Sequence, residues 1–212
     1  MNRSLVVTGT DTDAGKTLVS AAILGQYSSV FSDLNYYKPV QTGYPNDDDA
    51  ATVAKLSGCS RVIRGLQFKE PLSPHRAAEL ENREIDVDRL LADTEQLSQT
   101  GRLLIEGAGG LFVPLNRSTL FIDFFERINC PVVIVARSGL GTINHTLLSV
   151  EALRSRNIKI AAIAFMGPPN HDNIETIRQF TNVSILGPIQ FQDFENGPPV
   201  IDVDKILFRY FE

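Results

Sequence analysis

The stretch Thr8-Gly9-Thr10-Asp11-Thr12-Asp13-Ala14-Gly15-Lys16-Thr17 joins two segments of different pattern. The apolar residues 5–7 before it are typical of a buried strand, and residues 18–24 after it are typical of a helix. A strand, a glycine-bounded loop that ends in Gly-Lys-Thr, and a helix form the layout of a phosphate-binding P-loop. The sequence therefore predicts a nucleotide-binding protein.

Each part of this loop has a role in binding phosphate or its metal ion. Backbone N–H groups at a helix start point towards phosphates, and the helix dipole adds partial positive charge there. Lys16 can reach the β- and γ-phosphates, and the Thr17 hydroxyl can bind Mg²⁺. The spacing departs from the common G-x-x-x-x-G-K-[ST] form, because position 10 is Thr and Gly9 comes one residue early. A chance glycine-rich turn is the alternative, and the readable strand and helix on either side argue against it.

The bulk composition excludes several classes of protein. The chain has 212 residues and a net charge of −5, and no basic run favours binding to nucleic acid or to an anionic membrane. The longest apolar run, residues 160–166, is too short to span a bilayer. The first residues show no signal-peptide pattern. Cys59 and Cys130 lack metal-ligand spacing, so we expect two reduced cysteines in a cytoplasmic protein.

Apolar, strand-like runs alternate with helical patterns along the chain. We expect strands at residues 4–8, 35–40, 65–68, 102–106, 131–136, 159–165 and 184–186. We expect helices at residues 16–27, 49–57, 74–81, 87–98, 120–128, 143–156, 173–180 and 203–210. This alternation predicts one α/β domain over residues 1–212, with a doubly wound, mostly parallel sheet covered by helices on both faces. Ligands of such sheets bind beyond the carboxyl ends of the strands.

Two segments after the second predicted strand carry polar side chains of interest. Lys38, in Tyr37-Lys38-Pro39-Val40-Gln41-Thr42-Gly43, lies near the strand end, where it can donate a hydrogen bond to a phosphate or a carboxylate-like group. Taken alone, this lysine is more simply interpreted as a surface residue. Three consecutive aspartates, Asp47, Asp48 and Asp49, then open a helix, although one is enough for a cap. One of them can therefore hold a divalent cation, and spacing alone leaves open which.

Two later segments follow buried strands. Glu106 comes after three apolar residues, at the place where P-loop proteins complete their Mg²⁺ site with a carboxylate, more often Asp. The glycines that follow it allow a ligand to approach the backbone closely. In Gly139-Leu140-Gly141-Thr142-Ile143-Asn144-His145, we expect Thr142 to cap a helix whose start either binds an anion or is only a well-capped loop.

Taken together, these segments resemble dethiobiotin synthetase, the ATP-dependent carboxylase of biotin biosynthesis. The resemblance covers about residues 4–190 and rests on residues 7–17, Tyr37-Lys38-Pro39-Val40, Ser73-Pro74-His75, residues 105–110, residues 141–145 and Leu186-Gly187-Pro188-Ile189. It implies a P-loop NTPase fold and a cytoplasmic homodimer that uses ATP and Mg²⁺. It also implies that CO₂ carboxylates one amine of 7,8-diaminononanoate to a carbamate. ATP then converts this carbamate to a mixed anhydride, and the second amine closes the ring to dethiobiotin with release of ADP and phosphate.

The resemblance also implies roles for individual residues. Lys16, Lys38 and Thr12 would be catalytic, and Thr17, Asp49 and Glu106 would hold Mg²⁺. Asp49 is chosen because the family's aspartate precedes Ala. The substrate would contact Thr42, Ser73, Leu140, Gly141, Thr142 and Asn144, of which the stretch from Leu140 to Asn144 would come from the partner subunit. The nucleotide would contact Asp13, Ala14, Gly15, Lys16, Thr17, Leu18, Asp49, Glu106, Gly107, Ala108, Gly109, Met166 and Gly167.

The chain departs from the family in two places that concern the base. Met166-Gly167 stands where the family often has Asn-Asp, and the loop at about residues 190–196 matches poorly. Two other kinds of P-loop protein are alternatives. An amidoligase or cobyrinate-type enzyme usually needs an ammonia source or a further domain, for which 212 residues leave little room. A partitioning ATPase would carry a lysine where Asp11 stands.

Overall fold

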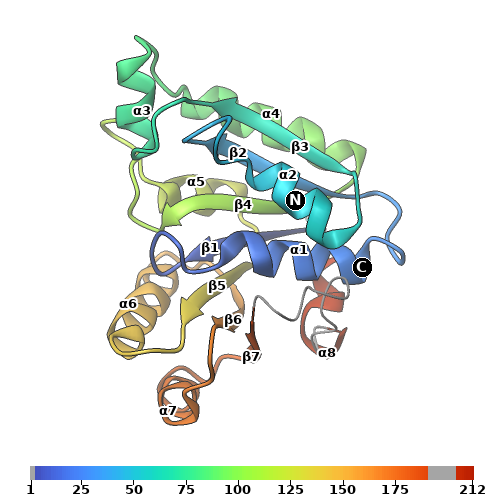
Figure 1. Ribbon diagram of the computed structural model, residues 1–212, viewed down its shortest axis with the longest axis vertical. Helices are drawn as coiled ribbons and strands as arrows, with labels where there is room; N and C mark the ends of the chain where they lie inside the picture. The colour runs from blue at the N-terminus through green and yellow to red at the C-terminus, as the bar shows by residue number, and fades with distance from the viewer. Residues whose placement is uncertain (1–2, 191–203) are drawn as a thin grey trace.

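Seven parallel strands form the sheet at the centre of the computed structural model, which describes residues 3–190 and 204–212. Their order across the sheet is β3-β2-β4-β1-β5-β6-β7, and each pairing between neighbours is parallel. The strands are β1 (Ser4–Gly9), β2 (Leu34–Gln41), β3 (Val62–Gln67), β4 (Arg102–Gly110), β5 (Val132–Arg137), β6 (Ile160–Met166) and β7 (Ile185–Ile189). The predicted doubly wound α/β fold is confirmed (Figure 1).

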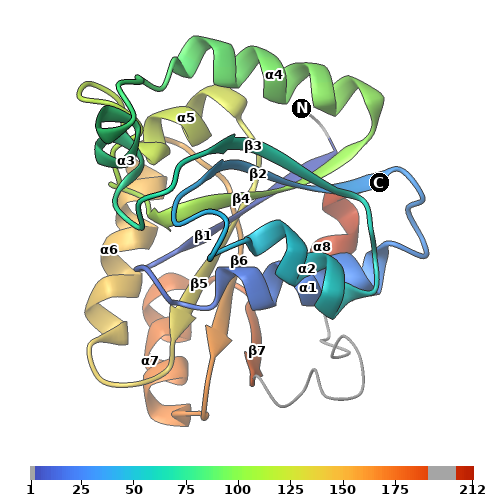
Figure 2. The same ribbon diagram turned by 45° about the horizontal axis from the view of Figure 1, so that its top comes forward.

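Helices cover both faces of this sheet (Figure 2). They are α1 (Lys16–Tyr27), α2 (Asp49–Ser57), α3 (Pro74–Leu80), α4 (Val87–Thr100), α5 (Phe121–Ile128), α6 (Thr142–Ser155), α7 (His171–Thr181) and α8 (Asp204–Leu207), followed by the short 3₁₀ helix η2 (Phe208–Tyr210). Helices α1, α2 and α8 contribute to the apolar cluster on one face, and α3 to α7 contribute to the cluster on the other. The sheet therefore has a hydrophobic core on each side.

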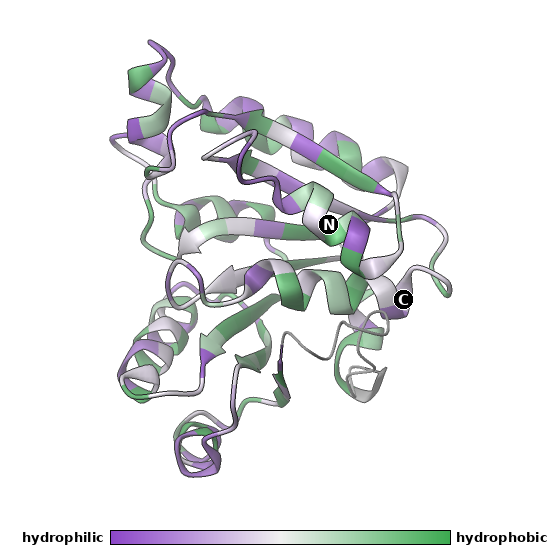
Figure 3. Ribbon diagram, in the orientation of Figure 1, coloured by the Kyte–Doolittle hydropathy of each residue, from purple (hydrophilic) through white to green (hydrophobic). Residues whose placement is uncertain are grey.

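The sequence explains why the central strands are buried on both faces. Strand β5 carries the run Val132-Val133-Ile134-Val135-Ala136, and all five residues are fully buried. Alternate residues of this run belong to the two opposite apolar clusters. Figure 3 shows hydrophobic colouring along β5, with a hydrophilic residue at its tip. This tip, Arg137, is exposed at the carboxyl edge of the sheet, where ligands of parallel sheets bind.

Most predicted elements agree with the observed ones to within a few residues, and β4 differs instructively. We expected the strand to end at Glu106, but β4 continues to Gly110, which pairs with Gly9 of β1. Glycines lack side chains that would separate the two backbones, so the strand can run on beside the P-loop. Glu106 therefore lies inside a buried strand rather than at its end.

Two helix starts also differ from expectation. The first residue of α6 is Thr142, and its cap is Gly141 in the left-handed region at φ 92°, so the prediction that Thr142 is the cap is wrong. The Thr142 hydroxyl lies 3.3 Å from the hydroxyl of Thr146 instead. At the end of the chain, the predicted helix at residues 203–210 divides into α8 and η2, and its first residue lies outside the described residues.

Candidate phosphate and metal site

The P-loop adopts a conformation that depends on its glycines. Gly15 caps α1 at φ 98°, a region that favours glycine, and Asp13 lies at φ 57°. A Cβ at Gly9 would come within 2.6 Å of the Asp11 carbonyl oxygen, so the early glycine allows the loop to fold back over β1. No side chain caps the start of α1. The first N–H groups of a helix lack partners within the helix, so this start can donate hydrogen bonds to an anion.

Lys16 lies over this loop. Its side chain is buried, and its Nζ donates to the Asp11 carbonyl oxygen at 3.3 Å. Burial holds the pKa of Lys16 below its usual value; the negative charge of Glu106 opposes this shift and the nearby positive charge of Lys38 adds to it. The Asp11 side chain points to the end of β5, where Arg137 donates to its Oδ2 at 3.3 Å. An acidic residue thus occupies the position of the partitioning-type lysine and is paired with a cation from the end of β5.

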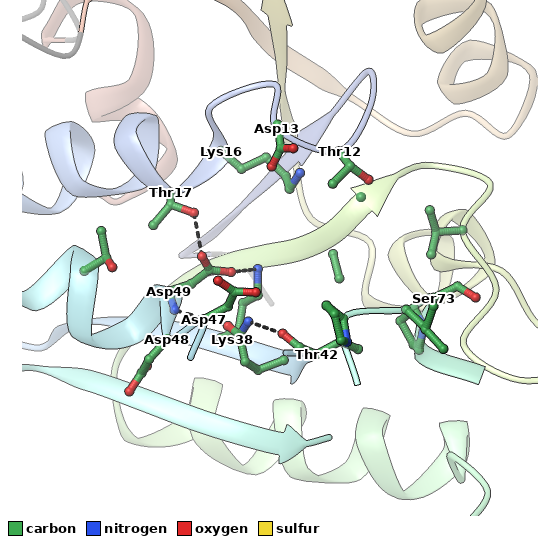
Figure 4. Close-up of a pocket in the computed structure, with 18 of the residues that line it drawn as sticks. Thr12, Asp13, Lys16, Thr17, Lys38, Thr42, Asp47, Asp48, Asp49 and Ser73 are labelled. Atoms are coloured by element: carbon green, nitrogen blue, oxygen red, sulfur yellow. Dashed lines mark hydrogen bonds and ion pairs between the residues drawn. The ribbon is translucent and has the colours of Figure 1, made fainter. Parts of the chain in front are cut away.

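Lys38 of β2 lies at the centre of a cluster of charged groups. Its Nζ is 2.5 Å from Asp49 Oδ2 and 2.9 Å from Glu106 Oε1, and it donates to the Gly107 carbonyl oxygen at 3.1 Å. The side chain is only 3% exposed and Glu106 is fully buried, so the surface-lysine alternative is wrong. The Thr17 hydroxyl lies 2.9 Å from Asp49 Oδ1 and 3.1 Å from Glu106 Oε1. In the close-up of Figure 4, dashed lines link Thr17 to Asp49 and Asp49 to Lys38.

The charges within this cluster reinforce one another. Burial alone would lower the pKa of Lys38, but the neighbouring carboxylates of Glu106 and Asp49 outweigh it and raise the pKa above its usual value. Burial would raise the pKa of Asp49, but the charge and hydrogen bond of Lys38 and the hydroxyl of Thr17 hold it below its usual value. The site therefore favours the charged ammonium form of Lys38, which lies between the carboxyl groups of Asp49 and Glu106.

The three consecutive aspartates have separate roles, which spacing could not assign. Asp48 is the N-cap of α2, where its Oδ1 accepts from the Ala51 N–H at 3.0 Å, and it also forms a salt bridge with Arg64 at 2.8 Å. Asp47 is exposed and its carboxylate lies against Gly43. Of the three, Asp49 is the one bonded to Lys38 and Thr17.

A cleft of about 820 Å³ opens over this cluster and brings together most of the predicted site residues. The P-loop forms one wall, and Ser73 with its neighbours Leu72 and Pro74 forms the opposite wall (Figure 4). Predicted residues that line the cleft are Thr12, Asp13, Gly15, Lys16, Thr17, Leu18, Lys38, Thr42, Asp49, Ser73, Ala108 and Gly109. Ala14, Glu106 and Gly107 lie behind this surface; Glu106 and Gly107 contact it through Lys38.

The sequence analysis missed one supporting residue of the cleft. The Gln41 side chain accepts from the Asp49 N–H at 3.2 Å and donates to the Thr42 carbonyl oxygen at 2.8 Å. It therefore ties the start of α2 to the end of β2. Its place three residues after Lys38 in the same strand was the available signal, because every polar residue at such a strand end is a candidate.

Two groups of predicted residues lie outside this cleft. Leu140, Gly141, Thr142 and Asn144 stand at the start of α6, and none of the four lines the cleft within this one chain. Met166, at the end of β6, is buried and packs against the P-loop, since a Cβ at Gly15 would lie 2.6 Å from Met166 Cγ. Gly167 follows it and donates its N–H to the Ile189 carbonyl oxygen at 2.8 Å. Most of the predicted nucleotide loop at residues 190–196 lies outside the described residues.

Comparison with known proteins agrees with this geometry. Residues 3–194 match a family model described as an AAA domain. A chain named ATP-dependent dethiobiotin synthetase BioD from Rhodopseudomonas palustris is 48% identical over 190 residues, which cover 88% of this chain and 87% of that one. The protein of the same name from Brucella anthropi is 46% identical, with 88% and 85% covered. This chain belongs to the dethiobiotin synthetase family.

Solved structures similar to this one are more distant in sequence. The MinC:MinD cell division protein complex of Aquifex aeolicus matches with a TM-score of 0.57 and 14% identity over 92% of this chain and 87% of that one. A ParA family ATPase from Chlorobium tepidum matches with a TM-score of 0.55 and 11% identity over 89% and 82%. At these identities the likeness concerns the fold alone, and it agrees with a parallel sheet covered by helices on both faces. Among the described residues, no helix is long and apolar enough to cross a bilayer.

Proposed function

We propose that this chain catalyses the ATP-dependent conversion of 7,8-diaminononanoate and CO₂ to dethiobiotin. The observation that carries the proposal is the position of two buried lysines, Lys16 and Lys38, in one cleft beside a P-loop. CO₂ and one amine give a carbamate, whose oxygen is a poor leaving group. Phosphorylation makes it a good one, and attack of the second amine on the carbamate carbon then expels phosphate and closes the ring.

Lys16 and Lys38 have the properties that this chemistry requires. Phosphoryl transfer depends mainly on positioning and on neutralising negative charge around the transferred group. Lys38 is held by three partners at 2.5, 2.9 and 3.1 Å, so its ammonium group is fixed in place before the substrates bind. We infer that the two lysines flank the γ-phosphate and the carbamate, with Thr12 at the lip of the same cleft.

The residues around Lys38 also fit a magnesium ion. Mg²⁺ in nucleotide sites takes oxygen ligands from one or two carboxylates, leaving its other positions for phosphate and water. Asp49 and Glu106 supply carboxylate oxygens, each within hydrogen-bond distance of the Thr17 hydroxyl, which supplies a third oxygen. Glu106 Oε2 is buried and accepts no hydrogen bond of ordinary geometry within the described residues. A bound Mg²⁺ would neutralise phosphate charge, and we propose these three residues as its protein ligands.

We further propose a homodimer in which the start of α6 binds the distal carboxylate of the substrate in the partner's cleft. Helix starts favour anions, and α6 has Gly141 rather than a side-chain cap. Within one chain, none of Leu140, Gly141, Thr142 and Asn144 lines the cleft, so the proposal assigns this contact to a second copy. Three apolar side chains in and next to α6 and α7 are exposed and suited to burial against another chain: Leu140, Leu148 and Phe180.

The remaining parts of the proposal concern the whole protein. We propose that residues 1–212 form one domain and that the protein works in the cytoplasm without binding nucleic acid or membrane. Both cysteines are buried and no disulfide joins them, which suits a reducing compartment. The net charge of −5 gives no attraction for polyanions.

The deciding experiment is mass-spectrometric detection of dethiobiotin from the diamine, bicarbonate, Mg²⁺ and ATP. We expect product with the wild-type protein and ADP formation that depends on both the diamine and bicarbonate. ATP hydrolysis without either would instead indicate a nucleotide switch of the partitioning type. Failure to form dethiobiotin under any of these conditions would overturn the proposed reaction.

A further inference from the structure

Below the charged cluster lies a tyrosine that the reaction described above does not use. Tyr36 of β2 is fully buried, and its hydroxyl forms no hydrogen bond of ordinary geometry within the described residues. Glu106 Oε2 is in the same condition. A buried polar group without a partner destabilises the folded chain, so two such atoms in one site indicate a function.

The two atoms face each other because of the strand register. Tyr36 is the Cα partner of Leu104 in the parallel pair of β2 and β4. Side chains two residues apart on a strand share a face, so Tyr36 and Lys38 lie on the same face as Leu104 and Glu106. Tyr36 and Leu104 both belong to the apolar cluster beneath α1 and α2. The ring of Tyr36 thus lies under the charged cluster on the side away from the cleft.

Electrostatics agree with this placement. The pKa of Tyr36 is raised well above its usual value, first by burial and then by the charges of Glu106 and Asp49 and by a polar contact with Glu106. Tyr36 is therefore in contact with Glu106, and its phenol hydroxyl is a group that can donate a hydrogen bond to a carboxylate oxygen. Catalytic hydrogen bonds are often long in the empty site and tighten once it is loaded.

We propose that Tyr36 is a positioning residue for the metal site, whose hydroxyl donates to Glu106 Oε2 and so orients Glu106 Oε1 towards Thr17 and the magnesium ion. The inference rests on the proposed magnesium site. It assigns to Tyr36 a supporting role of the kind that polar groups behind metal ligands commonly have, and loss of such support typically lowers metal affinity by about 10- to 100-fold. Without the hydroxyl, the Glu106 carboxylate is free to rotate away from the metal.

The test is metal binding by Tyr36→Phe, which removes the hydroxyl and keeps the ring. The probe is Mn²⁺, whose free fraction is followed by electron paramagnetic resonance with the protein saturated by a non-hydrolysable ATP analogue. We expect Mn²⁺ affinity to fall about tenfold, with unfolding temperature unchanged or higher because an unpaired buried hydroxyl is lost. Unchanged Mn²⁺ affinity would overturn the proposal, and so would failure of the wild-type protein to bind Mn²⁺.

The chain offers a matched control and a coupling test. Tyr37→Phe alters the next residue of the strand, which is equally buried but lies on the opposite face, where its hydroxyl contacts Thr94. We expect its Mn²⁺ affinity to match wild type. In the double variant with Glu106→Gln, the two losses in affinity should be less than multiplicative, because Tyr36 acts through Glu106. Multiplicative losses would mean that Tyr36 acts independently of Glu106. Because nothing here requires turnover, failure to make dethiobiotin would leave this result interpretable.

Discussion

The P-loop side of the cleft and the start of α6 differ in how complete they are within one chain. Around Lys38, four side chains from α1, β2, α2 and β4 contact one another, and the lysine and Glu106 are almost fully buried. At α6, by contrast, Leu140 and Asn144 are exposed and contribute to no shared cavity with Lys38. The charged cluster is therefore assembled within one chain, whereas the carboxylate site that we propose at α6 would need a second chain to meet a cleft.

The largest effect is expected when a cation is removed from the P-loop side of the cleft, which is complete within one chain. Lys38→Ala should lower kcat by about 10²–10³-fold, as is typical when one preorganised electrostatic contact is lost. Lys16→Ala should have an effect of the same order. The control is Lys55→Ala, which removes an exposed lysine from α2 and should leave turnover unchanged. Turnover near that of wild type in Lys38→Ala would contradict a catalytic role for Lys38.

The proposed contribution of the α6 start to the partner's cleft is tested by mixing inactive subunits. Lys16→Ala and Asn144→Ala proteins should each be inactive or weak, and exchange of subunits should restore part of the activity. One site of the mixed dimer would then combine an intact P-loop with an intact α6 start, while the other site would collect both defects. The measurement is dethiobiotin formation as a function of mixing ratio.

A matched mixture makes this experiment specific. Lys16→Ala combined with Lys38→Ala places both defects on the P-loop side, so no site in the mixed dimer is intact. We expect no recovery from that mixture. No recovery from either mixture, in dimers shown to be mixed, would mean that each site is built from one chain. Equal recovery from both mixtures would mean that the recovery does not come from sharing of the α6 start.

The two halves also differ in how far the sequence could predict them. The P-loop was predictable because its function follows from local spacing, and Lys16 and Thr17 line the cleft as expected. The sequence also indicated that Glu106 is a polar residue that follows buried apolar residues. It did not indicate that β4 continues beyond Glu106, because that continuation depends on the pairing of Gly9 with Gly110. Pairing between distant segments is not encoded in local spacing.

Tertiary contacts decided the remaining assignments. Spacing left the three aspartates equivalent, and the contact with Arg64 is what gives Asp48 a structural role. The cap of α6 was assigned to Thr142 from residue preference, but the backbone turns left-handed one residue earlier, at Gly141. Tyr36 was not distinguishable from an ordinary core tyrosine before the register of β2 and β4 placed it beside Glu106. These features depend on three-dimensional partners rather than on residue type.

A smaller effect, on Mg²⁺ affinity, is expected when a proposed metal ligand on the P-loop side of the cleft is changed. Glu106→Gln keeps the shape but removes the charge, and we expect Mg²⁺ affinity to fall by about 10- to 100-fold, the range seen even for residues that only support metal ligands. Activity should recover partly at high Mg²⁺. A Mg²⁺ dependence identical to that of wild type would make Glu106 structural.

Asp48→Ala provides the corresponding structural variant. It removes the cap of α2 and the partner of Arg64, so we expect a loss of about 1 kcal/mol in unfolding free energy. Its Mg²⁺ dependence should stay near that of wild type, as measured by activity across a Mg²⁺ titration. A marked increase in the Mg²⁺ concentration that activity requires would mean that Asp48 takes part in metal binding.

The last effect concerns selectivity for the nucleotide base, for which position 166 carries no amide. An amide at position 166 could exchange two hydrogen bonds with the adenine edge, whereas the Met166 thioether cannot donate and accepts only weakly. Met166 is also buried against Gly15 of the P-loop, away from the lining of the cleft. Each missing neutral hydrogen bond is worth about 0.5–1.5 kcal/mol, so two such losses reduce the preference for ATP by roughly 5- to 150-fold.

We therefore expect CTP, GTP and UTP to support dethiobiotin formation within about two orders of magnitude of ATP. The measurement is kcat/KM for the four nucleotides at saturating diamine and Mg²⁺. Met166→Asn is the matched variant, and it should raise the preference for ATP if the new amide reaches the base. A wild-type preference for ATP far above about a thousandfold, more than two hydrogen bonds supply, would mean that other groups read the base. In that case the loss of an amide at position 166 would have no bearing on selectivity, and the grip on the polyphosphate through Gly15, Lys16 and Thr17 would not dominate binding.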